Sequence, residues 1–162
     1  MPAARCFGGA KGSVATLRYF LSSLTETPKH RNTETAHGMK KANSVRDLDV
    51  YQSAFALQQA IFEVSRSFPK GETYSLTDQV RRSSRSVGAN LCEAWAKRRY
   101  PAHFLAKLTD SDGELQETIH WLATAEACAY LLPEQSSSLQ EDATKVGKQL
   151  GSMINCHESF CF

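Results

Sequence analysis

Apolar residues recur every three or four positions through most of residues 47–160, and this spacing constrains the fold more than any other feature of the chain. The pattern divides into four segments, and a proline marks each of the three links between them. The segments cover residues 47–68, 76–99 and 101–132, and a stretch that follows residues 136–138 and ends near residue 160. No strand pattern competes with them. Because short links force neighbouring helices to run antiparallel, the sequence predicts an all-α fold, an antiparallel up-down four-helix bundle.

The second segment carries the clearest local signals. Ser75-Leu-Thr-Asp78 has the spacing of a capping box, with Asp in place of the usual Glu, and Pro101 suits the first turn of the next helix. Small serines on the buried face would let a neighbouring helix approach closely. The predicted buried face consists of Leu76, Val80, Ser83, Ser84, Val87, Leu91 and Ala94.

Residues 1–38 differ in composition from the rest of the chain. Gly, Ser, Thr, Ala and single charges dominate them, and residues 25–38 show no apolar periodicity. We therefore expect a disordered N-terminal tail before a bundle of residues 39–162. Its first 25 residues hold basic but no acidic residues and a short amphipathic piece, which is a faint transit-peptide signature. The favoured alternative starts the protein at Met39-Lys40-Lys41, so that residues 1–38 are a start-site artefact without function.

The chain has a net charge of +2, but its charged residues are unevenly distributed along the sequence. Residues 39–102 hold eleven Lys and Arg against six Asp and Glu, whereas residues 103–162 hold three against nine. Opposite charges in two parts of one domain predict pairing between helices or subunits, or else a basic face for nucleic acid. No apolar run approaches the roughly 20 residues of a membrane span, and the five cysteines lack disulfide or metal spacing. These features predict a soluble, cytoplasmic protein without a membrane partner.

When the second segment is projected as a helix with 100° per residue, several arginines fall on one flank of its buried face. Arginines one or several turns apart can follow a phosphate backbone, and an indole can stack on a base. The nucleic-acid-binding candidates are Arg81, Arg85, Trp95 and Arg99. Alternatively, the arginines pair with acids of another helix or another subunit, and Trp95 is an interface aromatic. The third segment supplies suitable acids: Asp110, Asp112, Glu114 and Glu117.

The other flank of the second segment is polar and uncharged except at its end. Ser86, Asn90 and Glu93 lie there, and we expect them, with Glu114 of the third segment, to make contacts between helices or subunits. Catalysis would need a histidine or a second carboxylate nearby, and the second segment offers neither. Glu126 lies within the apolar stripe of the third segment, so we expect it to find a partner at a subunit contact.

Two short motifs have ligand residues but not a complete metal site. Glu117-x-x-His120 has the spacing found in di-metal bundles, but its second copy falls within residues 1–38. Cys156-His157, with Cys161, has no fourth ligand near in sequence. The chain also lacks a nucleophile elbow and a complete phosphate loop. The sequence therefore predicts no catalytic residue, no metal, no cofactor and no small-molecule substrate.

These motifs resemble a known group, the small four-helix bundle proteins of the 23S rRNA intervening-sequence family. The family pattern Leu-x-x-Gln-[Ile/Val]-Arg-Arg-Ala-x-x-Ser-[Ile/Val]-x-x-Asn-Ile-x-Glu-Gly is similar to residues 76–94, and Gly-Ser-x-x-Glu-Leu is similar to residues 110–115. The resemblance covers essentially residues 44–155. Three positions depart from the pattern: Ser83, Ala94 and Asp110.

The resemblance implies a bundle that assembles as a homo-oligomeric ring, commonly a pentamer, and that has no enzyme activity. A relative of the group is the diversity-generating retroelement accessory variability protein, which binds nucleic acid and a reverse transcriptase through a basic surface. We therefore predict a non-enzymatic, self-associating bundle that serves as an interaction or RNA-associated protein. The alternative is a nucleic-acid-binding accessory factor for a reverse transcriptase or ribosomal RNA, with RNA or DNA as partner.

Overall fold

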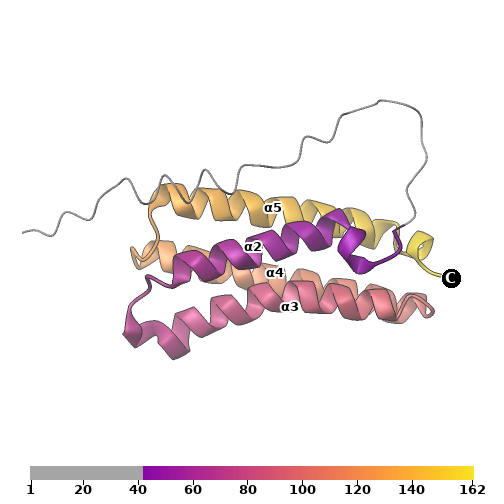
Figure 1. Ribbon diagram of the computed structural model, residues 1–162, viewed down its shortest axis with the longest axis horizontal. Coiled ribbons are helices and arrows are strands. Elements are labelled where there is room, and N and C mark those ends of the chain that lie inside the picture. The colour runs from indigo at the N-terminus through magenta and orange to yellow at the C-terminus, as the bar shows by residue number, and fades with distance from the viewer. Residues whose placement is uncertain (1–41) are drawn as a thin grey trace, which may run out of the picture. The chain divides into compact units, whose positions relative to one another are not determined.

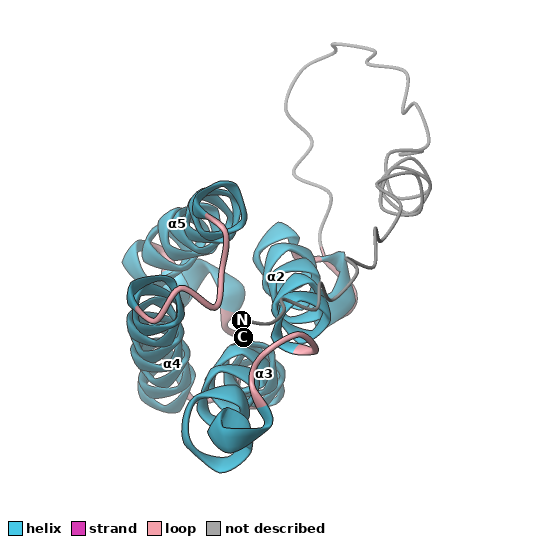
Figure 2. Ribbon diagram, turned by 90° about the vertical axis from the view of Figure 1, so that its left-hand side faces the viewer, coloured by secondary structure: helices cyan, strands magenta, loops and turns pink. Residues whose placement is uncertain are grey.

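Four long helices form the protein in the computed structural model, which describes residues 42–162. They are α2 (Asp49–Ser65), α3 (Asp78–Ala96), α4 (Pro101–Ala127) and α5 (Pro133–Asn155). Each packs on the next along the chain, and α5 returns to pack on α2 (Figure 1). The end view in Figure 2 shows the order α2, α3, α4, α5 around the bundle. The predicted all-α up-down bundle is confirmed for these residues, whereas the predictions for residues 1–38 lie outside the described range.

Short helical turns accompany the long helices. They are η1 (Val45–Asp47), η2 (Lys70–Glu72), η3 (Thr73–Thr77) and η4 (His157–Phe160). η3 is a wide turn that leads directly into α3, so the chain is already helical at Ser75. The predicted capping box there is wrong, because the Ser75 hydroxyl donates to the Glu72 carboxylate instead and α3 begins without a side-chain cap.

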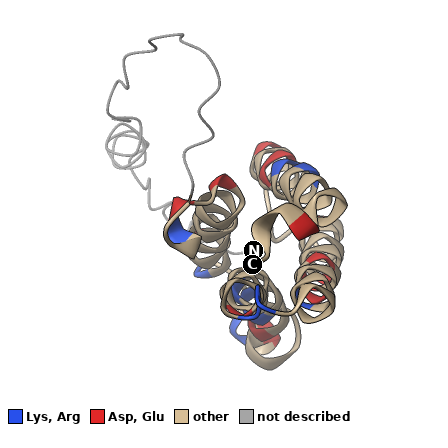
Figure 3. Cartoon of the chain, turned by 90° about the vertical axis from the view of Figure 1, so that its right-hand side faces the viewer, with Lys and Arg blue, Asp and Glu red and all other residues tan. Residues whose placement is uncertain are grey.

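All four long helices end earlier than their sequence patterns predict, at Ser65, Ala96, Ala127 and Asn155. α3 therefore stops before Lys97, and the basic residues that follow it lie in the turn to α4. Figure 3 shows Lys and Arg gathered at this end of α3. α5 begins at Pro133 rather than after residue 138, because proline at the first helical position loses no hydrogen bond.

The early end of α4 has a local cause. Ala129 has a φ of 58°, in the left-handed region, and reverses the chain direction. Its N–H donates to the Glu126 carbonyl at 2.8 Å, and the Tyr130 N–H donates to the Ala125 carbonyl at 2.9 Å. This pair of bonds is a Schellman motif, which normally carries glycine at the left-handed position.

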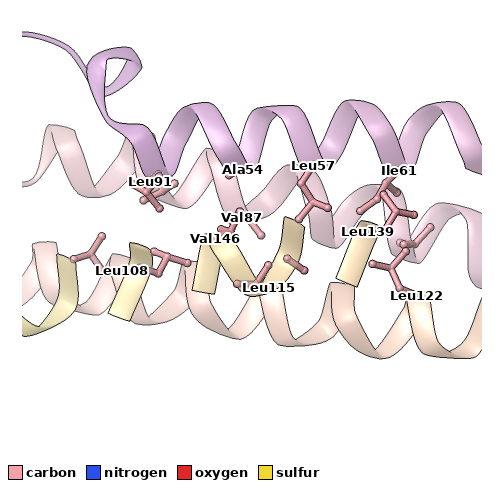
Figure 4. Close-up of a cluster of buried hydrophobic side chains, with 14 of the residues drawn as sticks. Ala54, Leu57, Ile61, Val87, Leu91, Leu108, Leu115, Leu122, Leu139 and Val146 are labelled. Carbon is pink, nitrogen blue, oxygen red and sulfur yellow. The ribbon is translucent and has the colours of Figure 1, made fainter. Parts of the chain in front are cut away.

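The apolar core follows the bundle axis and takes side chains from all four helices (Figure 4). Its largest fully buried members include Phe104, Leu57, Ile61, Leu91, Leu108, Leu115, Leu122 and Leu150. Every residue of the predicted buried face of the second segment, from Leu76 to Ala94, is buried. The burial pattern of α3 thus follows its sequence periodicity, and its two flanks are free to face α2 and α4.

Small polar side chains line the seam between α3 and α4, the two long helices that make the most extensive contact among residues 42–162. The Ser111 hydroxyl donates to the Val87 carbonyl at 2.9 Å. The hydroxyls of Thr118 and Ser83 lie 3.0 Å apart, and both residues are buried. Because these hydroxyls bond across the seam, two polar-lined helices can pack closely without leaving buried groups unsatisfied.

Candidate interaction faces

The arginine flank of α3 lies against aromatic side chains of α2. The Arg81 guanidinium carbon is 5.0 Å from the centre of the Phe62 ring, and that of Arg85 is 5.9 Å away. The Arg81 Nε also donates to the Ser65 hydroxyl at 2.7 Å. Since α2 and α3 run antiparallel, the end of α2 reaches the beginning of α3 and supplies the ring. The contacts are of the cation–π kind and hold the two guanidinium groups on one surface.

The aromatic stripe continues along α2 beyond Phe62. Tyr51 and Phe55 are one turn apart and stack with ring centres 6.3 Å apart. Phe55 is 48% exposed, which is unusual for a side chain of its size within a regular helix. We call this surface the arginine–aromatic face, and it consists of Tyr51, Phe55, Phe62, Arg81 and Arg85.

No arginine of this face has an acidic partner within residues 42–162. The ion pairs between described side chains join Arg66 to Glu63, and Lys107 to both Glu93 and Asp110. The pairing of α3 arginines with acids of the third helix, which the sequence allowed, is therefore not formed within the described part of the chain. The positive charge of Arg81 and Arg85 remains available to an external anionic group.

Trp95 and Arg99 lie apart from the arginine–aromatic face, near the other end of α3. At about 1.5 Å per residue, Arg85 is some 17 Å from the end of the helix. Trp95 is half-buried, and the Arg98 guanidinium carbon lies 3.4 Å from its ring centre. Arg99 is exposed in the turn that follows α3. The four candidate residues thus form two separate groups rather than one stripe.

Arg98 is a residue that the helical projection missed. Its Nε donates to the Trp95 carbonyl at 3.0 Å, and its guanidinium carbon lies 5.1 Å from the centre of the Phe162 ring. Burial lowers the pKa of Arg98, while the Cys161 thiol opposes that change. The projection placed Arg98 off the flank because it extended the helix through Arg99, and no sequence signal reveals the contact with the C-terminal residue.

The opposite flank of α3 forms a shallow groove with α4. The groove measures about 440 Å³, and four of its lining residues are charged. Lys107 binds three acceptors there: Glu93 Oε2 at 2.9 Å, Asp110 Oδ2 at 3.1 Å and Asn90 Oδ1 at 3.3 Å. We call it the acidic groove, and its lining comprises Asn90, Lys107, Thr109, Asp110, Gly113, Glu114 and Glu117.

The charges in the acidic groove are unequally satisfied. The hydrogen bonds that Lys107 donates to Glu93 and Asp110 raise the pKa of Lys107, and the bond that Glu93 accepts from Lys107 lowers the pKa of Glu93. Burial, followed by the neighbouring Glu117, raises the pKa of Glu114, although Arg82 opposes this effect. Neither Glu114 nor Glu117 has an ion-pair partner among residues 42–162. All three donors of the Lys107 ammonium group are therefore already used, and the groove keeps an excess of negative charge.

The remaining polar residues singled out in the sequence lie on the same helices. Ser86 is half-buried on the groove side of α3. Glu126 does not depend on a subunit contact, because it accepts hydrogen bonds from the Ser136 hydroxyl at 2.6 Å and the Gln140 amide at 3.2 Å. The Schellman turn brings the end of α4 to the first turn of α5, where a carboxylate is also favoured by the helix dipole.

The two short ligand motifs make local contacts. Glu117 accepts a hydrogen bond from the Trp121 indole at 3.0 Å, and the His120 ring meets Trp121 edge-on. His157 Nδ1 lies 2.9 Å from the Ile154 carbonyl. Within residues 42–162, no three His, Cys, Asp or Glu side chains gather in a way that could hold a metal ion. No helix in the same range is both long and apolar enough to cross a membrane.

Comparison with known proteins places the bundle in a family. Residues 46–152, about two thirds of the chain, match the family described as 23S rRNA-intervening sequence protein. The chain belongs to this family. It is also similar to a crystal structure from Bacteroides thetaiotaomicron, described as a protein of unknown function from the S23 ribosomal protein family. The TM-score is 0.60 at 28% identity, over 65% of this chain and 95% of the other. No curated protein matches the chain.

The family match covers all of α3 but not the C-terminal segment. It includes the whole arginine–aromatic face and the acidic groove, both of which lie within residues 46–152. It stops before Phe160 and Phe162, which contact Phe104 and Arg98 respectively. The aromatic contacts made by the C-terminal segment therefore lie outside the part of the chain that matches the family.

Proposed function

We propose that this chain is a self-associating helical bundle that serves as an interaction or RNA-associated protein and performs no catalysis. The observation that carries the proposal is the arginine–aromatic face, where two arginines without acidic partners among residues 42–162 contact Phe62, and the half-exposed Phe55 lies two turns away on the same side of α2. Aromatic residues and arginine are the residues enriched in protein interfaces. Because Phe62 already orders both guanidinium groups, binding through them costs less conformational entropy than binding through free side chains.

The resemblance to the family adds an expectation about the assembly. It implies a ring, commonly a pentamer, and we propose that the face described above contributes to one side of the contact between subunits. Light scattering at micromolar concentration tests self-association directly. An oligomer supports the proposal, and a monomer at that concentration contradicts it.

Two truncations test the face itself. Phe55→Ala and Arg85→Ala each remove a side chain of the kind that dominates interface energies, with typical costs of about 1–2 kcal/mol, or roughly five- to thirtyfold in the dissociation constant. Lys145→Ala, an exposed position on α5, is the matched control and should leave association unchanged. Equal effects at all three positions would argue against a specific role of the face.

The alternative function is a nucleic-acid-binding accessory factor. It is favoured by the distribution of positive charge, since six of the twelve Lys and Arg in residues 42–162 lie between Arg81 and Arg99. The same range holds fifteen Asp and Glu, so the overall charge does not attract a polyanion. Any such binding would therefore rely on the local arginine groups and would fall with increasing salt.

Fluorescence anisotropy with labelled RNA and DNA tests this alternative. Binding should weaken between about 50 and 200 mM salt, and Arg85→Ala or Arg99→Ala should each reduce the salt slope by about one. Lys145→Ala again provides the control. No detectable binding to either nucleic acid at low salt would remove the alternative.

A further inference from the structure

We infer that the arginine–aromatic face of one copy docks on the acidic groove of a second copy, in a head-to-tail arrangement. The inference rests on the proposed self-association and adds the two surfaces that meet. One surface presents Arg81 and Arg85, and the other presents Glu114 and Glu117; none of these four side chains forms an ion pair within residues 42–162. Each surface is the chemical complement of the other on the same chain.

The acidic groove cannot satisfy its own carboxylates. Its only lysine, Lys107, already binds Glu93, Asp110 and Asn90, and an ammonium group has three protons to donate. Glu114 and Glu117, of which Glu117 accepts one hydrogen bond from Trp121, therefore remain open to a cation from outside the groove. A guanidinium group is the favoured partner because it binds a carboxylate through two parallel hydrogen bonds.

The spacing of the two charge pairs is compatible with simultaneous contact. Arg81 and Arg85 are four residues apart on α3, which corresponds to a rise of about 6 Å. Glu114 and Glu117 are three residues apart on α4, which corresponds to a rise of about 4.5 Å. Arginine side chains are long enough to absorb the difference, so both pairs can form between two aligned helices.

The apolar part of the face also finds a counterpart in the groove. Phe55 is half-exposed two turns from Phe62 on the same side of α2, and its ring could lie on a flat surface of a second copy. Gly113 lines the groove and is exposed, and a methyl group added to it would meet no other atom within 4 Å. The absence of a side chain at this position leaves backbone open to an aromatic ring.

The arrangement of the two surfaces determines the type of assembly. They lie on either side of α3, which sits between α2 and α4 in the end view of Figure 2. Contacts between two different surfaces are head-to-tail, and they generate a closed ring when the rotation between copies closes. Because the surfaces adjoin one another rather than lie on opposite sides of the bundle, successive copies turn, and a ring is the expected product.

Charge reversal tests the docking. Arg85→Glu places like charges against the groove, and Glu114→Arg places like charges against the face. We expect each single variant to raise the dissociation constant at least tenfold in sedimentation experiments. The double variant Arg85→Glu/Glu114→Arg exchanges the two charges, and we expect its dissociation constant to return to within about threefold of the unmodified chain.

Matched control variants and a neutral substitution show whether the effect of charge reversal is specific to the two surfaces. Lys145→Glu and Glu141→Arg make the same reversals at exposed positions of α5 and should leave association unchanged. Glu114→Gln removes the charge with little change in shape and should weaken association less than Glu114→Arg. Circular dichroism identifies any variant that fails to fold, and for such a variant Glu114→Gln and Arg85→Ala replace the reversal.

The outcomes separate this inference from the proposed function. An oligomer that both single reversals leave intact, or that the double variant fails to restore, overturns the docking and leaves self-association standing. A monomeric unmodified chain overturns both. If Arg85→Glu abolishes RNA binding but leaves the oligomer unchanged, the face binds nucleic acid and the docking is also overturned.

Discussion

Replacing Ala129 with glycine is expected to raise the free energy of unfolding. Ala129 adopts a φ of 58°, where the Cβ of an L-residue crowds the following carbonyl at a cost of about 1–2 kcal/mol. Glycine removes this strain, but its greater freedom in the unfolded chain offsets about 0.5–1 kcal/mol. The net gain is therefore about 0.5–1 kcal/mol, because the two hydrogen bonds of the Schellman motif involve only backbone atoms and are retained.

Urea unfolding followed by circular dichroism measures this change. The transition midpoint should rise while its slope stays constant, since the surface exposed on unfolding is the same. Ala123→Gly is the matched control, because Ala123 is exposed within α4 and the same substitution there should cost about 1 kcal/mol. The unmodified chain and the two variants must be compared at one concentration, because self-association also stabilises the fold. Equal losses of stability at both positions would refute the strain at Ala129.

Three further predictions concern the helices around the two faces. Gly88→Ala should stabilise the protein by about 0.5–1 kcal/mol in urea unfolding, because alanine favours the helix interior and the added methyl group has its nearest atoms at 3.9 Å. A loss of stability would show that the added methyl group does not fit between α2 and α3. Leu115→Ala should cost about 2–5 kcal/mol, because this fully buried side chain would leave a cavity; a cost below about 1 kcal/mol would contradict the packing. The stabilising contribution of Glu93 bound to Lys107 should be present at neutral pH and lost as pH falls through the lowered pKa of Glu93; unfolding curves at neutral and acidic pH check this sign.

The sequence predicts correctly those features of the bundle that depend on the residues of a single helix, such as which side chains are buried. The buried face of α3 follows from periodicity alone, including Ser83 and Ser84, because each residue's direction depends only on its position along one helix. The small serines also indicate a close neighbour, and α4 does pack there. These features need no knowledge of which helix lies alongside.

The sequence fails where a feature depends on two segments or on an atypical residue. The contact of Arg81 and Arg85 with Phe62 joins residues of different helices, and periodicity does not specify which residues lie opposite one another. The turn at Ala129 lacks the glycine that usually marks a left-handed residue, so α4 was extended too far. The early end of α3 likewise separated Arg99 from the other arginines.

The mass of the unmodified chain in solution tests the central claim most directly. Sedimentation equilibrium at micromolar concentration should give an integer multiple of the 18.0 kDa chain mass, and a fivefold multiple if the assembly is the ring that the family resemblance implies. A mass of 18.0 kDa across the accessible concentration range would contradict self-association. Arg81 and Arg85, which form no ion pair within residues 42–162, would then be open to a different partner.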